Sequence, residues 1–269
     1  MTSTPEDTVR RAAASFNAGR IDEARRLCEQ ELKRSPGEPM LSHLLAAVLF
    51  SRHDVATARV HIAASLARRP DNAAAQLLAA RIARAGKDFA AALGHVDRAL
   101  ALAPQRDTLV EKARILDQAG HRAPARETWQ AILKAVPDSG EAAARLGRLA
   151  FEDGDLAGAA SYLERATSAD APASAWFDLG LVRQDQRDHI AAVAAYRKAL
   201  ALKPDHAEAA LNLGIALQES GDPEAAMQSY SEAYRLRPEM LGSIAMALTS
   251  ASHGRLWLDE AALRLALTR

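Results

Sequence analysis

Prolines recur along this chain at a nearly constant interval, and that interval limits the folds available to it. Pro36, Pro70 and Pro104 follow one another at intervals of 34 residues, and the same interval separates Pro204 from Pro238. Pro137 follows Pro104 by 33 residues, and 67 residues then lead to Pro204, one short of two intervals. A proline stops a helix at or before the preceding residue. Self-similarity at such a period is typical of stacked repeat proteins, so the spacing predicts a chain of structural repeats.

Seven segments can be superposed in phase with the prolines. They cover residues 5–38, 39–72, 73–106, 107–139, 140–172, 173–206 and 207–240. The sixth and seventh share a Leu-Gly pair, a polar turn, an Ala-Ala pair, an aromatic residue and a closing proline, whereas the second and third match more loosely and the first and fourth are degenerate. Glycine inside a helix costs about 1 kcal/mol relative to alanine, so its recurrence at Gly147, Gly180 and Gly214 indicates close helix contacts. Each segment therefore predicts two short helices separated by a turn.

This pattern resembles the tetratricopeptide-repeat consensus. The matching residues are Trp176, Leu179, Gly180, Ala192, Tyr196, Ala199 and Pro204 in the sixth segment, and Leu213, Gly214, Ala226, Tyr230, Ala233 and Pro238 in the seventh. The resemblance covers about residues 5–240. It implies an all-α fold, a right-handed superhelical solenoid of stacked antiparallel helix pairs occupying residues 1–240.

Residues 241–269 are expected to cap the solenoid within the same domain. Residues 241–253 are in phase with the first helix of an eighth unit, and a short second helix is expected after Asp259, a suitable N-cap. Leu256, Trp257 and Leu258 are then expected to cover the end of repeat seven, because a stack of repeats must not leave an apolar end in water.

Composition narrows the classes of partner. Lys plus Arg and Asp plus Glu number 34 each, and without a basic excess nucleic-acid binding is not expected. The longest apolar run, residues 44–50, is too short to cross a bilayer, so no direct membrane insertion is expected. Cys28 is the single cysteine, and MTSTPEDTVRR lacks the apolar stretch of a secretory signal, which favours a cytoplasmic location. The Ala- and Arg-rich composition favours a bacterial source.

The neutral total hides a charge asymmetry. Residues 1–136 hold 21 basic and 15 acidic residues, a difference of +6, whereas residues 137–269 hold 13 and 19, a difference of −6. Opposite ends attract weakly and the attraction is screened by salt. We therefore expect a monomer with weak, salt-sensitive self-association.

No catalytic residue, cofactor site or metal site is predicted. The eight histidines include no His-x-x-x-His pair, and Cys28 has no cysteine partner for zinc ligation. A glycine-rich phosphate loop and a Gly-x-Ser-x-Gly elbow are also lacking. The aromatic series Trp129, Tyr162, Tyr196 and Tyr230 is expected to be core.

The resemblance also implies a concave groove, lined by the first helix of each pair, that receives extended peptides or helices. The corresponding candidate residues here are Arg81, Arg84, Arg148, Phe177, Leu181, Gln184, Leu211, Asn212, Ile215 and Gln218. Among them the apolar residues form a strip that either contacts a partner or is covered by superhelical curvature or the carboxy-terminal helix. The arginines either bind partner carboxylates or form a solvated charged face.

The predicted function is a non-catalytic scaffold or adaptor that binds a protein or peptide. Some members of the family hold a partner's terminal carboxylate with Lys, Asn and Arg from three repeats, and others line the groove with asparagines. Only Asn212 fits either pattern here. The alternative is a recruiting or regulatory subunit of a separate modifying enzyme, such as a glycosyltransferase or sulfotransferase. A catalytic protein within a repeat framework has no supporting motif.

Overall fold

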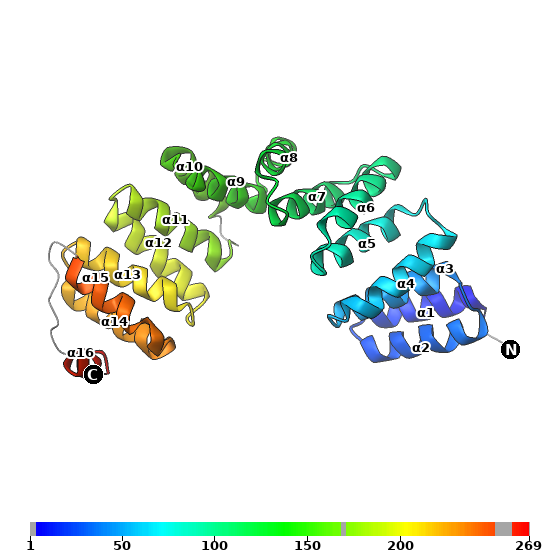
Figure 1. Ribbon diagram of the computed structural model, residues 1–269, viewed down its shortest axis with the longest axis horizontal. Helices are drawn as coiled ribbons and strands as arrows, with labels where there is room; N and C mark the ends of the chain where they lie inside the picture. Colours follow the sequence, from blue (N-terminus) through cyan, green and yellow to red (C-terminus); the bar gives the residue numbers. More distant parts are fainter. Residues whose placement is uncertain (1–3, 168–170, 251–259, 269) are drawn as a thin grey trace. The chain divides into compact units, whose positions relative to one another are not determined.

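The chain forms paired helices joined by short turns (Figure 1). The computed structural model describes residues 4–167, 171–250 and 260–268, and in these ranges it contains no β-strand. The all-α repeat fold predicted from the proline spacing is therefore confirmed. Contacts divide the chain into two compact units, residues 1–132 and 133–269, and each is described by itself.

The first unit contains three closely packed helix pairs and most of a fourth, whose second helix runs three residues past residue 132. Its helices are α1 (Pro5–Asn17), α2 (Ile21–Arg34), α3 (Pro39–Ser51), α4 (Val55–Arg68), α5 (Ala73–Ala85), α6 (Phe89–Leu102), α7 (Arg106–Gln118) and α8 (Arg122–Ala135). The first three pairs also pack on one another in sequence order, and α6 packs on α7. Trp129 of α8 donates a hydrogen bond to Asp117 of α7 over 2.8 Å, which ties the fourth pair together.

The second unit repeats this arrangement. Its helices are α9 (Gly140–Glu152), α10 (Leu156–Ala166), α11 (Ala173–Asp185), α12 (His189–Leu202), α13 (Ala207–Glu219), α14 (Pro223–Leu236), the short 3₁₀ helix η1 (Pro238–Met240), α15 (Leu241–Ser250) and α16 (Glu260–Leu267). Each odd-numbered helix from α9 to α13 packs against the helix that follows it. Together the two units hold the seven pairs that the repeat spacing predicts.

Aspartate residues begin five of the seven second helices. The side chains of Asp54, Asp88, Asp155, Asp188 and Asp222 each accept a hydrogen bond from the backbone N–H three residues later, at 2.9–3.2 Å. Such a cap satisfies one of the N–H groups that a helix start leaves without a partner, and its loss costs about 1 kcal/mol. The capping aspartates therefore fix where each of these helices starts.

The residue before each second-helix cap adopts a left-handed backbone conformation. Glycine fills this position at residues 19, 120, 154 and 221, with φ between 75° and 90°. His53, Lys87 and Arg187 fill it elsewhere, with φ of 60–63°. In the turn Gly86-Lys87-Asp88 it is therefore Lys87, and not the adjacent glycine, that adopts the left-handed conformation.

Each pair crosses where a small residue of the first helix lies sixteen positions before a larger residue of the second. The seven pairs are Ala12 and Cys28, Ala46 and Ile62, Ala80 and Val96, Ala113 and Trp129, Gly147 and Leu163, Gly180 and Tyr196, and Gly214 and Tyr230, all of them buried. The aromatic series predicted from sequence needs one correction here. In the fifth pair the interior residue is Leu163, whereas Tyr162 is half-buried beside it, one position out of phase.

The carboxy-terminal helices contact the same core as the seventh pair. Leu263 and Leu267 of α16 are buried in a cluster with Tyr230 of α14 and Ile244 of α15. Arg264 also donates a hydrogen bond to the Tyr234 hydroxyl over 3.0 Å, so α16 packs on α14. The expected roles of Leu256, Trp257, Leu258 and Asp259 lie outside the described residues.

Candidate functional site

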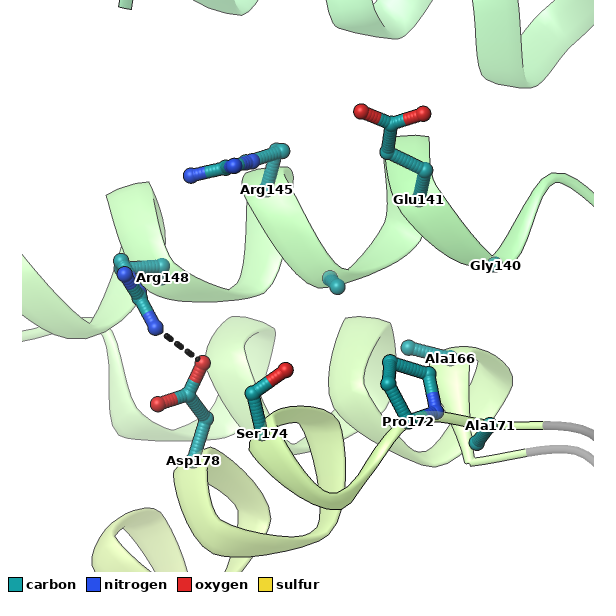
Figure 2. Close-up of a pocket in the computed structure, with 10 residues that line it drawn as sticks. Gly140, Glu141, Arg145, Arg148, Ala166, Ala171, Pro172, Ser174 and Asp178 are labelled. Atoms are coloured by element: carbon teal, nitrogen blue, oxygen red, sulfur yellow. Dashed lines mark hydrogen bonds and ion pairs between the residues drawn. The ribbon is translucent and has the colours of Figure 1, made fainter. Parts of the chain in front are cut away.

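A pocket of about 600 Å³ opens between the first helices α9 and α11 of the second unit (Figure 2). Its lining is dominated by small side chains: Gly140, Ala144, Ala166, Ala171, Pro172 and Ser174. These residues cannot fill the space between the two helices, whereas larger side chains would close it. The pocket lies on the first-helix face, where the family resemblance places a groove.

Charged side chains border this pocket. Arg148 of α9 donates a hydrogen bond to Asp178 of α11 over 2.7 Å, and this ion pair closes one end of the pocket (Figure 2). Glu141 and Arg145 also belong to the lining, but they project from α9 away from α11. The predicted groove residue Arg148 therefore lies at the pocket, already paired with a carboxylate.

The four predicted apolar groove residues pack against the core of the second unit. Phe177, Leu181, Leu211 and Ile215 are half-buried beside the cluster around Tyr196 and Tyr230. The Phe177 ring lies 4.7 Å from the His206 ring and 5.9 Å from the Tyr196 ring, centroid to centroid. These side chains therefore contribute to packing and also keep part of their surface exposed.

The two predicted glutamines are hydrogen-bonded to core tyrosines. The Tyr196 hydroxyl donates to Gln184 Oε1 and the Tyr230 hydroxyl donates to Gln218 Oε1, each over 2.9 Å. Gln218 is 2% exposed, so its carboxamide is not presented at the surface. Burial raises the pKa of both tyrosines, which keeps their hydroxyls protonated as donors. Asn212 of α13 is half-buried.

The two predicted arginines of the first unit converge on a buried carboxylate. Arg84 of α5 donates from Nε to Glu111 Oε1 over 2.6 Å, and Arg81 Nε lies 3.7 Å from Glu111 Oε2. Glu111 belongs to the neighbouring first helix, α7, and is 1% exposed. Both arginines were predicted from the sequence, but the sequence carries no sign that Glu111 is buried between them.

Within the described ranges, no cluster of three or more His, Cys, Asp or Glu side chains has the geometry of a metal site. Cys28 is buried, and burial raises the pKa of its thiol to about 12, so it is a poor nucleophile. Among the described residues, no helix is both long enough and apolar enough to span a membrane.

Antiparallel helix pairs that stack on one another in sequence order define the class of α-helical repeat proteins. Sequence profiles described as tetratricopeptide repeat match residues 15–82, 110–175 and 177–240. These segments make up most of the chain, so the chain belongs to the tetratricopeptide-repeat family. A comparison with curated proteins found no significant match.

Solved structures share the fold. The APC/C hetero-tetramer Cut9–Hcn1 aligns with a TM-score of 0.67 and 14% identity over 99% of this chain, which spans about half (49%) of that chain. A tetratricopeptide repeat protein from Parabacteroides merdae aligns with a TM-score of 0.65 and 14% identity. The alignment covers 90% of this chain and 97% of that protein. PilW, a type IV pilus biogenesis factor, aligns with a TM-score of 0.66 and 17% identity. The alignment covers 76% of this chain and 96% of PilW. At these identities the likeness concerns the fold alone.

Proposed function

We propose that this protein is a non-catalytic scaffold that binds a partner polypeptide on its first-helix face, with the pocket between α9 and α11 as one contact point. The observation that carries the proposal is the pocket itself, a volume of about 600 Å³ lined by small residues and closed at one end by the Arg148–Asp178 ion pair. A concave site of this size accommodates one or more side chains of a bound segment.

The polar groups around the pocket suit a peptide. Arg148 and Asp178 offer guanidinium donors and carboxylate acceptors at one place, and a peptide backbone carries both kinds of complementary group. Ser174 adds a hydroxyl from the α11 side. An apolar side chain can then occupy the space beside Ala144 and Ala166 while its backbone bonds to the rim. Membership in the family and the occurrence of a similar fold in the Cut9–Hcn1 assembly support the proposal.

The proposal is tested by filling the pocket. Ser174→Trp places an indole in the space between α9 and α11, and Ser161→Trp is the matched control because Ser161 is an exposed serine on the second helix α10. Tagged wild-type protein and both variants are used to capture partners from the cells that produce the protein, followed by mass spectrometry. We expect a specific partner to be lost with Ser174→Trp and retained with Ser161→Trp, while both variants keep wild-type helical content.

A partner that binds both tryptophan variants as well as wild type would contradict the role of this pocket. Turnover of any substrate by the purified chain would contradict the non-catalytic part of the proposal.

A further inference from the structure

Glu111 is a carboxylate buried on the first-helix face of the first unit, and α5 supplies two cations to it. Arg84 is firmly placed: its Nε bonds to Glu111 Oε1 over 2.6 Å and its Nη1 lies 3.4 Å from Gln118 Oε1. Arg81 is held loosely, because its Nε is 3.7 Å from Glu111 Oε2, beyond hydrogen-bonding distance. Glu111 Oε2 has no hydrogen-bond partner among the described residues.

The charges of Arg81, Arg84 and Glu111 do not balance. Two guanidinium groups from one turn of α5 share a single carboxylate, which leaves one positive charge even when Arg114, 3.7 Å from Glu111, is left out of the count. Like charges three residues apart on a helix repel each other, and neither α5 nor the neighbouring first helix α3 contains an acidic residue. By contrast, Arg148 in the second unit faces one carboxylate, Asp178.

The two arginines also differ in exposure. The Arg84 side chain is 22% exposed and uses its donors on Glu111 and Gln118, so it positions the cluster. The Arg81 side chain is 39% exposed and makes no hydrogen bond to Glu111. Its guanidinium can therefore turn toward a bound group, and guanidinium donors match the two oxygens of a carboxylate.

We propose that Arg81 binds a side-chain carboxylate of an acidic partner segment, with Glu111 and Arg84 holding the site in place. The inference rests on the proposed scaffold function and names the chemistry of the partner for the first unit. A partner carboxylate supplies the negative charge that the cluster lacks. Because α3, which lies beside α5, is apolar and uncharged, a partner segment that mixes acidic and apolar residues suits this face. A nucleic acid suits it less well, because its phosphates require a row of basic side chains.

The test uses defined probes. Binding to the full chain is measured by fluorescence anisotropy with a labelled oligoglutamate of about ten residues, a Gly-Ser peptide of equal length, and a single-stranded DNA of about ten nucleotides. Charge is reversed at Arg81 (Arg81→Glu) and, as a control, at Arg98, an exposed arginine on the second helix α6 (Arg98→Glu). Arg81→Gln is the milder variant if the reversal disturbs folding.

We expect oligoglutamate to bind, Arg81→Glu to weaken it by about tenfold or more, and Arg98→Glu to change it less than about twofold. Arg81→Gln should give an intermediate loss, and the Gly-Ser peptide should not bind. Equal losses at Arg81 and Arg98, tighter binding of DNA than of oligoglutamate, or no oligoglutamate binding would each overturn the inference. Capture of the cellular partner that is abolished by Ser174→Trp but unchanged by Arg81→Glu would overturn this inference alone and leave the proposed function standing.

Discussion

Gly180 of α11 lies directly against the ring of Tyr196 of α12. A Cβ atom built on this glycine would sit 2.6 Å from Tyr196 Cδ1, well inside van der Waals contact. Gly214 has the same relationship to Tyr230, with Cβ also 2.6 Å from Cδ1. Because protein interiors are close-packed, the glycine and the ring sixteen residues later must be considered as one packing unit.

Adding a methyl group at this contact should destabilise the protein. We expect Gly180→Ala to lower the free energy of unfolding by about 1–3 kcal/mol, because the tyrosine ring must move from its packed position. Gly94→Ala is the control: Gly94 lies within α6, and a Cβ added there would meet no atom within 4 Å, so alanine should stabilise by about 0.5–1 kcal/mol. Thermal melts followed by circular dichroism measure both. Equal effects at the two glycines would contradict the close contact.

The buried pair Tyr230 and Gln218 permits a double-mutant test. Tyr230→Phe removes the hydroxyl that donates to Gln218 Oε1 and leaves a buried carboxamide unpaired, which should cost about 1–3 kcal/mol. Replacing Gln218 with leucine as well removes the unpaired group, so the double variant should recover part of the loss. Urea denaturation of the four proteins measures the coupling. Strict additivity would show that the two side chains do not interact.

Mild acid should destabilise the first unit. Burial lowers the pKa of His43, His61 and His95 below the ordinary value of 6.5, since each loses solvation of its charged form. As the pH falls through 6.5, the unfolded chain therefore binds protons that the folded chain does not, and the free energy of unfolding decreases. We expect a lower urea midpoint at about pH 5.5 than at about pH 7.5. Replacing all three histidines with glutamine should reduce this difference, and an unchanged difference would assign it to other groups.

Glycine should be favoured at the left-handed turn positions that lack it. Lys87→Gly and Arg187→Gly remove a side chain from a backbone with φ of 60°, and we expect each to stabilise by about 0.5–1 kcal/mol. The reverse change, Gly221→Lys, should destabilise, because Gly221 has φ of 90°. Gly86→Ala should be tolerated, since its φ is −80° and a Cβ there meets only ordinary contacts. Thermal melts compare the four variants, and a loss of stability with Lys87→Gly would contradict the assignment.

The repeat fold could be predicted from sequence because it depends on local, periodic signals. Prolines, alanines and glycines recur at fixed positions, and each records a helix end or a close crossing. Tyr162 shows where this approach fails. An aromatic residue attracts attention, but the phase of the repeat assigns the interior position to Leu163. The aromatic residue lies one position before the interior position of the repeat. The side chain at the interior position is the one that is buried.

The groove residues were harder to predict because side chains in the last turn of a first helix can either face the groove or bond to the second helix of the same pair. Gln184 and Gln218 occupy positions that the family resemblance assigns to the groove, yet tyrosines twelve residues later in the sequence take up their carboxamides. Such a bond depends on the crossing of two helices and has no local signature. Likewise, the repeat pattern placed Arg81 and Arg84 on the groove face, but the burial of Glu111 depends on how α5 meets α7.

The paired positions at the helix crossings also form an ordered series along the chain. The first three pairs combine alanine with Cys28, Ile62 or Val96, and the last two combine glycine with tyrosine. Between them lie the two mixed combinations, Ala113 with Trp129 and Gly147 with Leu163. A Cβ at the glycine position of the last two pairs would overlap the tyrosine ring. A first helix from one of the first three pairs, which carries alanine there, could therefore not replace α11 or α13 unless that ring moved.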